Sequence, residues 1–420
     1  MQLKSPAMNL SLLTLAAGSM LSAVGGAAAA AEGSDWQADA ALLYYGELGR
    51  VTAIEPVLNL KRAWSAEQSA SATLVLDALG GASHNGAAVV SSVQTFTGSS
   101  GGEDEDGEDD EGGGVQTFAA GEVPLIRGFE DFRVALDLAY VQPINTPLNT
   151  VSVGSSMSKE EDYLSIGFNG GLATELFSRN TKISVGGGGS YDQIAPEGGI
   201  PQALGDSILA VSTLDGDDKW VGDLSLGLTQ VINKISIVQL NYNYGQSSGY
   251  HNDPYKIISR LDAAGVPIDY LNESRPEKRV KQSLYGALKL ALGAHSVTGS
   301  YRYYWDDWAV VAQTLDGLLR FNLSDSLYLE GHGRWHQQSK AEFYQLWLAS
   351  ADPVPVFASA DHRLGDLQTR TLGLNVGYKL NTSLAFALRT EWYHQSDPVT
   401  ANKAAQLDAV ISQLSVSLGF

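Results

Sequence analysis

The chain has 420 residues, a net charge of −20 and no cysteine. Hydrophobic residues make up 44% of it, which is too few for a bundle of membrane helices and too many for a disordered chain. The negative charge argues against a nucleic-acid partner, which needs a basic surface. The lack of cysteine excludes disulfides and thiolate chemistry. A globular or barrel protein remains.

Residues 1–31 are typical of a cleavable signal peptide. Lys4 precedes an apolar stretch over 10–21, and small residues at 27–31 lead to Glu32. The alternative is a single membrane anchor, which three glycines in this segment disfavour. No later stretch approaches about 18 consecutive apolar residues. An exported chain of this kind must be soluble in the periplasm, secreted, or inserted as a barrel.

Residues 32–420 divide into alternating segments of about ten residues. Leu284, Leu288 and Leu292 share one face of such a segment, and Tyr285 and Lys289 occupy the other. Strands of a soluble sandwich also alternate, but a sandwich rarely keeps so many strands at this length. The pattern therefore predicts an all-β chain that forms a transmembrane antiparallel β-barrel.

The segments predict a barrel of about 16 strands with long extracellular loops, an even number as bacterial barrels show. Short turns are expected around residues 66, 146, 179, 233, 293, 324 and 381, on the periplasmic side. Long connections are expected at 80–126, 193–218, 247–280, 338–367 and 396–405, on the outside. The predicted strands begin near Trp36, Val51, Gln68, Arg127, Asn149, Asp162, Thr181, Lys219, Ile235, Lys281, His295, Trp308, Ser326, Gln368, Ser383 and Gln406.

The end of the chain is the most specific feature. Leu414, Val416, Leu418 and Phe420 alternate with polar or small residues, so the last strand has one lipid face and ends on an aromatic residue. Such an end is a signal for the barrel-insertion machinery. Together with the signal peptide it predicts a protein of the outer membrane of a Gram-negative bacterium, in contact with outer-membrane lipids.

Charged residues of both signs fall on the predicted lumen face. Arginines on successive strands would form a basic wall whose field orients polar solutes in a pore. Alternatively, the charges pair across the lumen and keep its interior wet. The candidate lumen charges are Arg302, Arg320, Glu330, Arg334, Arg389 and Glu391.

Residues 99–114 form an acidic, Gly-rich loop that contains eight carboxylates. It could gather Ca²⁺, although it lacks the spaced ligands of an EF-hand loop, and a solvated insertion is the simpler interpretation. His84, His251 and His362 fall in predicted external loops without a metal-binding spacing. We therefore expect no metal, no cofactor and no nucleic acid.

Motifs spread over nearly the whole mature chain resemble an uncharacterised proteobacterial outer-membrane family, domain of unknown function 3570. The resemblance implies an exported membrane barrel and supplies no catalytic residues. The matching stretches are 81–86 (GASHNG), 116–118 (QTF), 227–233 (GLTQVIN), 252–256 (NDPYK), 275–276 (RP), 301–303 (YRY), 306–308 (DDW) and 343–344 (FY).

Polar residues of these motifs map to the predicted outer rim. We expect them to fold the loops inward as a lid or constriction that selects what enters. The candidate rim residues are His84, Asp253, Lys256, Arg275, Asp306, Asp307 and Tyr344.

The sequence favours a porin-like channel for small polar solutes, since about 16 strands leave room for an aqueous passage. The alternative is a barrel plugged by its own loops that binds or anchors a partner protein or ligand at the surface. A surface hydrolase is a remote alternative. It would use the adjacent carboxylates of Asp306 and Asp307, which a tight turn explains equally well. We therefore expect that the protein is not an enzyme.

Overall fold

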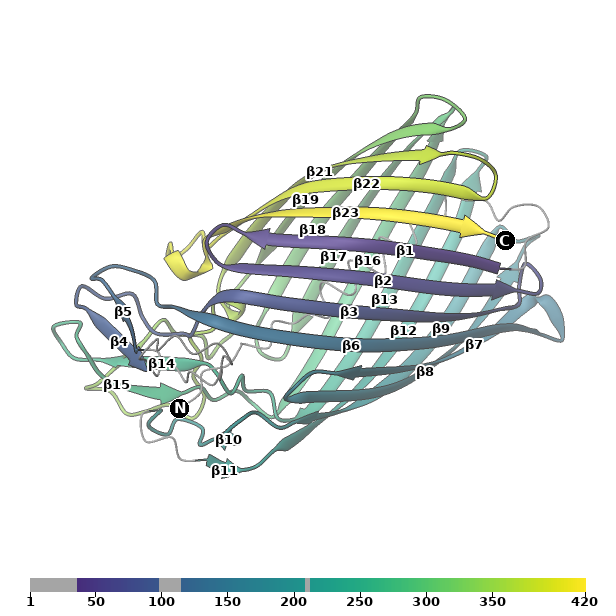
Figure 1. Ribbon diagram of the computed structural model, residues 1–420. Coiled ribbons are helices and arrows are strands. Elements are labelled where there is room, and N and C mark those ends of the chain that lie inside the picture. Colours follow the sequence, from purple (N-terminus) through teal and green to yellow (C-terminus); the bar gives the residue numbers. More distant parts are fainter. Residues whose placement is uncertain (1–35, 98–114, 208–211) are drawn as a thin grey trace, which may run out of the picture.

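The computed structural model describes residues 36–97, 115–207 and 212–420. Within these residues, sixteen strands close into an antiparallel barrel (Figure 1). In order around the barrel they are β1 (Trp36–Glu47), β2 (Val51–Ala63), β3 (Ser69–His84), β6 (Leu125–Ile144), β7 (Thr146–Lys159), β8 (Tyr163–Leu176), β9 (Thr181–Ile194), β12 (Asp217–Asn233), β13 (Ser236–Gly249), β16 (Lys278–Leu292), β17 (His295–Asp306), β18 (Val311–Asn322), β19 (Leu327–Gln338), β21 (Leu367–Lys379), β22 (Leu384–Ser396) and β23 (Leu407–Gly419).

The predicted barrel is confirmed. Each strand starts within three residues of its predicted position. The barrel closes where β1 pairs with β23, and Ala38 lies opposite Leu418. The backbone N–H of Trp36 also donates to the carbonyl oxygen of Phe420, at 3.1 Å. The last strand is therefore the seam of a wall with no free edge, as a membrane barrel requires.

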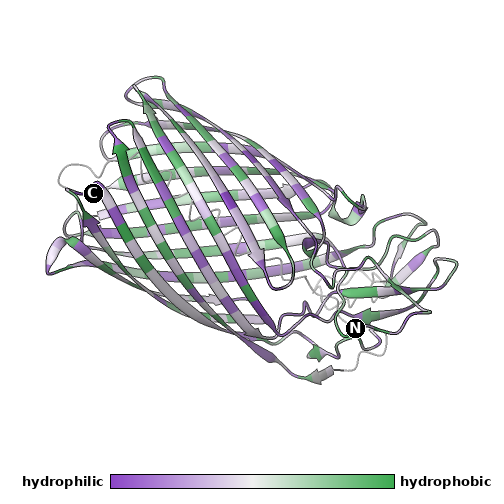
Figure 2. Cartoon of the chain, turned by 180° about the vertical axis from the view of Figure 1, so that it is seen from behind, coloured by the Kyte–Doolittle hydropathy of each residue, from purple (hydrophilic) through white to green (hydrophobic). Residues whose placement is uncertain are grey.

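Side chains alternate between a lipid face and a lumen face. On β1, Leu42 is 49% exposed on the outer wall, whereas its neighbour Leu43 is 2% exposed. Leu284 and Leu288 on β16 are likewise exposed on the outside. Figure 2 shows the resulting bands of apolar and polar residues along the strands. This continuous apolar surface is suited to lipid.

The two ends of the barrel differ. Both chain ends of the barrel, at β1 and β23, lie at the end with short connections, such as 293–294 between β16 and β17. Bacterial barrels turn such an end toward the periplasm. The longest connections gather at the opposite end, as Figure 1 shows. They span 85–124, 195–216, 250–277, 339–366 and 397–406.

The long connections contain structure of their own. One sheet has the order β15-β14-β20, and its β14 and β20 are parallel. Two further pairs, β4 with β5 and β10 with β11, are hairpin-like. The elements are β4 (Gln94–Thr97), β5 (Val115–Phe118), β10 (Ile200–Pro201), β11 (Ser212–Leu214), β14 (Ile257–Leu261), β15 (Pro267–Asn272), β20 (Leu348–Ala349), η1 (His362–Leu364) and η2 (Lys403–Ala405).

Two expectations lie outside the described residues: the signal peptide at 1–31 and the acidic loop at 99–114 with its Ca²⁺ hypothesis. Both stay predictions. In the described part of the chain, no helix is long and apolar enough to cross a membrane.

Candidate functional site

Loops from three distant parts of the barrel wall meet across its opening. The first follows β3, the second joins β13 to β16, and the third joins β19 to β21. Around the barrel, β3 and β13 are separated by the five strands β6, β7, β8, β9 and β12, and by more strands the other way. Contacts between these loops must therefore span the mouth of the barrel.

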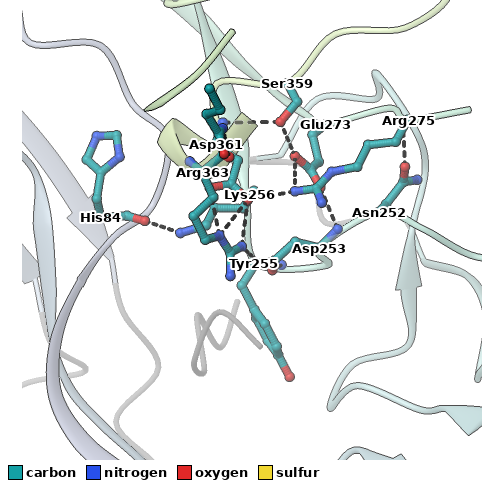
Figure 3. Close-up of polar contacts among 11 residues, drawn as sticks. His84, Asn252, Asp253, Tyr255, Lys256, Glu273, Arg275, Ser359, Asp361 and Arg363 are labelled. Atoms are coloured by element: carbon teal, nitrogen blue, oxygen red, sulfur yellow. Dashed lines mark hydrogen bonds and ion pairs between the residues drawn. The ribbon is translucent and has the colours of Figure 1, made fainter. Parts of the chain in front are cut away.

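Six charged residues, of which Lys256, Asp253, Glu273 and Asp361 are buried, hold the three loops together (Figure 3). Three are cations and three are carboxylates, so their formal charges cancel. We call this group the ion cluster. It consists of Lys256, Arg275, Arg363, Asp253, Glu273 and Asp361.

Asp361 lies at the centre of the ion cluster and is 1% exposed. Arg363 donates from Nε to both its carboxylate oxygens, at 2.9 and 2.8 Å. Arg275 Nη2 donates to Asp361 Oδ2 at 2.9 Å. Burial alone would raise the pKa of Asp361, but the charges of Arg363 and Arg275 outweigh burial and hold it well below its usual value. Asp361 is therefore ionised and joins two loops.

Arg363 and Lys256 extend these contacts to the other loops. Arg363 Nη2 donates to Asp253 Oδ2 at 2.8 Å. Lys256 is 2% exposed, and its ammonium donates to the backbone carbonyl of His84 at the end of β3. Burial lowers the pKa of Lys256, and the nearby Asp253 and Asp361 oppose that shift. These contacts connect the β13–β16 loop to both of the others.

Glu273 accepts hydrogen bonds from several parts of the loops. The backbone N–H of Asp253 and the hydroxyl of Ser359 each donate to its carboxylate at 2.5 Å. Arg275 Nε lies 2.7 Å from Glu273 Oε1. Burial raises the pKa of Glu273 to about 6, and Arg275 works against that rise. Asn252 completes this side by accepting from the backbone N–H of Arg275 at 2.6 Å.

Gly86 allows the backbones of two loops to approach closely. The backbone N–H of Ile257 donates to the carbonyl of Asn85 at 2.9 Å. Gly86 has a φ of +99°, and a Cβ there would collide with the carbonyl oxygen of Ile257. Only glycine meets both conditions at low cost. The 81–86 motif therefore has a structural role where its loop crosses the mouth.

The remaining candidate rim residues belong to a neighbouring cluster around Trp308. Tyr344 packs in this apolar cluster, and its hydroxyl accepts from Asn402 Nδ2 at 3.1 Å. Asp306 Oδ2 accepts from Arg279 Nη2 at 2.6 Å. Its other oxygen accepts from the backbone N–H of Trp308, at 3.0 Å. Asp307 Oδ1 accepts from the backbone N–H of Val280, at 2.9 Å.

Both adjacent carboxylates thus stabilise the β17–β18 turn and its neighbouring strand. This geometry favours the turn interpretation of Asp306 and Asp307 over a shared-proton pair.

The histidines are embedded in the loops. The rings of His84 and His362 lie 6.2 Å apart. The hydroxyl of Ser247 lies 2.7 Å from His251 Nε2. His251 Nδ1 lies 2.8 Å from the Gly249 carbonyl oxygen. Burial lowers the pKa of His251 to about 4. Across the described ranges, no group of three or more His, Asp or Glu side chains is arranged to hold a metal ion.

Within the lumen, five of the six candidate charges take part in ion pairs. Arg320 Nε lies 2.8 Å from Glu330 Oε2, and Arg389 pairs with Glu391. Arg334 Nε lies 3.0 Å from an Asp316 oxygen, and its side chain is 51% exposed.

His332 connects two of these lumen pairs. Its Nε2 lies 3.0 Å from Asp316, and its Nδ1 lies 2.6 Å from Glu391. Gly373 on the intervening strand leaves the space, since a Cβ there would lie 2.6 Å from Glu391 Oε1. The chain of contacts runs Arg334, Asp316, His332, Glu391, Arg389. We call it the lumen network.

Arg302 differs from the other lumen charges. It is exposed, and its guanidinium lies over the ring of Tyr285 at 5.7 Å. No ion pair links it to a described carboxylate. It therefore presents a free positive charge to the lumen.

The opposite wall of the lumen carries little charge. β8 and β21 lie on opposite sides of the barrel, with seven strands between them in either direction. The lumen positions of β7, β8 and β9 are mostly serine, glycine and asparagine. They include Ser152, Gly154, Ser156, Ser165, Gly167, Asn169, Ser184, Gly186, Gly188 and Ser190.

Sequence reasoning placed His84, Asp253, Lys256 and Arg275 at the rim, and the structure brings these four together. It did not place Glu273, Ser359, Asp361 or Arg363 at the rim; the first three are buried and Arg363 is partly exposed, and all four take part in the same contacts. Asp361 and Arg363 flank His362 in the sequence, but only the fold shows that both reach another loop.

A family model described as "Protein of unknown function (DUF3570)" matches residues 10–415. The chain belongs to this family. The resemblance drawn from the motifs is therefore confirmed. No curated protein matches the chain.

Solved structures with a similar fold include membrane channels and receptors. Pseudomonas aeruginosa OccK3 (OpdO) has 12% identity and a TM-score of 0.41, with 93% of this chain and 96% of that chain covered. The CymD monoaromatic hydrocarbon channel has 10% identity and a TM-score of 0.38, with coverages of 92% and 89%. The siderophore receptor PirA from Acinetobacter baumannii has 9% identity and a TM-score of 0.41, with coverages of 87% and 53%. This chain thus spans about half the length of that receptor.

Proposed function

We propose that this protein is an outer-membrane channel for small polar solutes, and that the ion cluster holds a lid over its mouth. The observation that carries the proposal is the asymmetric lumen, where a charged wall faces a wall of mostly small uncharged residues, in which Asp192 is paired with Lys219 at 3.1 Å. Barrels of about 16 strands leave an aqueous passage. Small side chains on one wall leave that passage wide.

The exposure of the lumen charges supports a wet interior. Arg302 is exposed, and Arg334 has half of its side chain exposed. A charge in a dry interior costs several kcal/mol unless it is fully paired. A charged wall opposite an uncharged wall also produces a field across the pore, which orients polar solutes as they pass.

The ion cluster supports a lid function for the loops. Four of its charged groups lie on the β13–β16 loop and two on the β19–β21 loop. Lys256 reaches the third loop through the His84 carbonyl, and all groups but Arg275 and Arg363 are buried. Removing one partner from such a buried pair costs about 3–5 kcal/mol. The contacts therefore hold the loops in one arrangement across the mouth, and that arrangement sets the size of the opening.

The membrane setting belongs to the same proposal. Residues 1–31 direct export, and the strand that ends at Phe420 is read by the barrel-insertion machinery. The closed barrel and its apolar outer wall are consistent with insertion in the outer membrane of a Gram-negative cell.

Single-channel conductance in planar bilayers tests the proposal. The wild-type protein should conduct, and an Asp253→Ala/Arg275→Ala variant should conduct more and with more frequent fluctuations. Arg260 and Asp269 form an ion pair at 2.9 Å in the loop sheet but outside the ion cluster. Arg260 also donates to the Ser350 carbonyl of the β19–β21 loop, at 3.3 Å. The matched control is therefore Asp269→Ala alone, which should behave as wild type. Unchanged current and selectivity in the first variant would refute the lid.

The second candidate function is a plugged barrel that binds or anchors a partner at the surface. The burial of four of the six charges and the charge balance of the ion cluster favour it, since such a lid resists opening. Absence of current from folded wild-type protein, together with capture of a periplasmic or surface partner on the immobilised barrel, would replace the channel with this function.

A further inference from the structure

The outer wall has a groove at the end of the barrel that carries the short turns. It runs over β2, β3, β6, β7 and β8 and has a volume of about 670 Å³. Its floor includes Ala70 and Ala72, two small side chains on the lipid face of β3. Leu60 on β2 and Leu138 on β6 lie on either side of Ala72 in register. The small residues thus leave a trough between larger ones.

The dimensions of this trough suit one hydrocarbon chain. Neighbouring strands are about 4.8 Å apart, so the walls on β2 and β6 stand about 10 Å apart. Phe168, which is 69% exposed, stands on the far side. Apart from one arginine, the groove is lined by apolar, aromatic and small residues.

That arginine, Arg62, lies at the end of the groove nearest the turns. Its guanidinium carbon lies 5.2 Å from the ring centre of Trp36 and 5.2 Å from that of Trp64. Its Nε is buried and has no hydrogen-bond partner. No described carboxylate forms an ion pair with it. Nearby Glu67 pairs instead with Arg179, at 2.9 Å.

The position of Arg62 corresponds to the headgroup level of the membrane. Trp36, Trp64 and Tyr140 surround it, and tryptophan and tyrosine gather at membrane–water interfaces. Because short turns face the periplasm in bacterial barrels, this is the periplasmic leaflet. An unpaired cation at that level, above an apolar trough, matches a lipid that has a phosphate at one end and an acyl chain at the other.

We propose that the groove binds one anionic glycerophospholipid of the periplasmic leaflet. The phosphate accepts hydrogen bonds from Arg62, and one acyl chain lies over Ala70 and Ala72. A second copy of this chain fits the groove less well, because the lining residues include no carboxylate to pair with Arg62. A contact between copies would leave this guanidinium buried without an anion, which is costly.

Native mass spectrometry of the intact, folded barrel in mild detergent tests the proposal, with phosphatidylglycerol and phosphatidylethanolamine as probes. The wild type should retain phosphatidylglycerol about tenfold better than phosphatidylethanolamine, because the ammonium group of the second lipid offsets the phosphate charge that attracts Arg62. Arg62→Ala should abolish this preference, and Arg62→Lys should keep part of it. Ala72→Leu, which fills the trough, should weaken retention of both lipids.

Arg370 provides the matched control. It is exposed on the outer face of β21, near the end of the barrel that carries the long connections and away from Arg62. Arg370→Ala should therefore leave lipid retention unchanged. Heat-modifiable migration on a gel shows that each variant is folded.

Three outcomes would overturn the proposal. The first is equal retention of the two lipids by the wild type. The second is wild-type retention by both Arg62→Ala and Ala72→Leu. The third is a stable oligomer that Ala72→Leu dissociates, which would assign the groove to a second copy of the chain.

Discussion

The ion cluster in the loops and the lumen network are built from the same groups but differ in their contact with water. In the ion cluster, Asp361 is 1% exposed and contacts two arginines. In the lumen network, Arg334 is half exposed and contacts a single carboxylate, and nearby Arg302 has no ion pair. In the ion cluster, the charges are paired with one another. The lumen network and nearby Arg302 leave positive charge available to a solute.

This difference separates a structural role from a functional one. A largely buried, balanced set of charges holds a single geometry, since each group lost leaves another unpaired. Half-exposed charges on a pore wall keep a field that acts on passing ions. We therefore expect substitutions in the loops to change how far the channel opens, and substitutions in the lumen to change what it prefers.

The largest effect is expected from Arg363→Ala. This change removes contacts to both Asp253 and Asp361, and we expect a loss of about 3–5 kcal/mol from the closed loop arrangement. Hydrogen exchange of loop peptides in the folded barrel should accelerate, while exchange in the barrel strands should not change. The control Asp269→Ala should alter only its own hairpin. Equal protection of the loops in Arg363→Ala and wild type would show that the ion cluster does not hold them.

Gly86→Ala tests the same loops without removing a charge. The added methyl group would meet the Ile257 carbonyl in an unfavourable backbone conformation, at a cost of about 1–3 kcal/mol. Protection of residues 252–261 against hydrogen exchange should fall. Gly121 also has a positive φ, but nothing lies within 4 Å of its Cβ position. Gly121→Ala should therefore perturb the loops less, and an equal effect of both changes would contradict the close-approach argument.

The next effect is expected from Arg302→Glu in the lumen. Replacing a free cation by an anion should shift ion selectivity toward cations, by a few-fold on the order expected for one exposed charge. The reversal potential across a KCl gradient measures this shift. Arg370→Glu makes the same charge change on the outer wall and should leave selectivity as it is. A similar shift in both variants would show that ion selectivity does not depend on charge at the lumen wall.

Acidification provides a further test, because it affects the loops through His84, His251 and His362. Burial lowers the pKa of His84 to about 3. Burial lowers the pKa of His251 to about 4 and that of His362 well below its usual value of 6.5. In opened loops these histidines would take up protons below about pH 6.5, whereas in the closed loops they stay neutral. The stability of the closed loops should therefore fall as the pH drops from 6.5 toward 4.

Glu273 opposes this trend. Its pKa of about 6 lies above the ordinary 4.5, so it favours the closed loops as the pH drops from 6 to 4.5. With three histidines against one carboxyl, we expect a net increase in channel fluctuations at pH 4.5 relative to pH 7. His251→Asn should reduce the increase. Quieter channels at pH 4.5 would mean that Glu273 dominates.

The smallest effect is expected from the uncharged wall. Ser225→Phe on the lumen face of β12 should lower conductance by roughly a quarter without changing selectivity, since it narrows the pore without adding charge. Leu226 is the next residue and is 45% exposed on the outer wall. Leu226→Phe should therefore leave conductance unchanged, and an equal fall in both variants would contradict the assignment of faces.

The barrel could be predicted from sequence because its strands are long and each keeps one apolar face. The error of three residues at the start of β18 has a physical cause. Trp308 and Val310 look like the start of a strand, but they are buried in the apolar cluster with Phe343 and Tyr344. Packing of the loops, rather than hydrogen bonding between neighbouring strands, determines where β18 begins.

The ion cluster could be predicted only in part. Local motifs pointed to Asp253, Lys256 and Arg275, but contacts across the mouth depend on which loop reaches which. Charged loop residues such as Glu273 and Asp361 are ordinarily exposed, so nothing in their neighbourhood predicts burial. The pairing of the lumen charges likewise depended on Gly373, whose lack of a side chain leaves room for Glu391.

The most direct test of the central claim is the conductance of purified, folded protein in planar bilayers, recorded for wild type beside Arg363→Ala and Arg302→Glu. The account predicts a wild-type channel whose conductance rises in Arg363→Ala and whose ion preference changes only in Arg302→Glu. A wild-type barrel that carries no current, and that stays closed in Arg363→Ala, would contradict it.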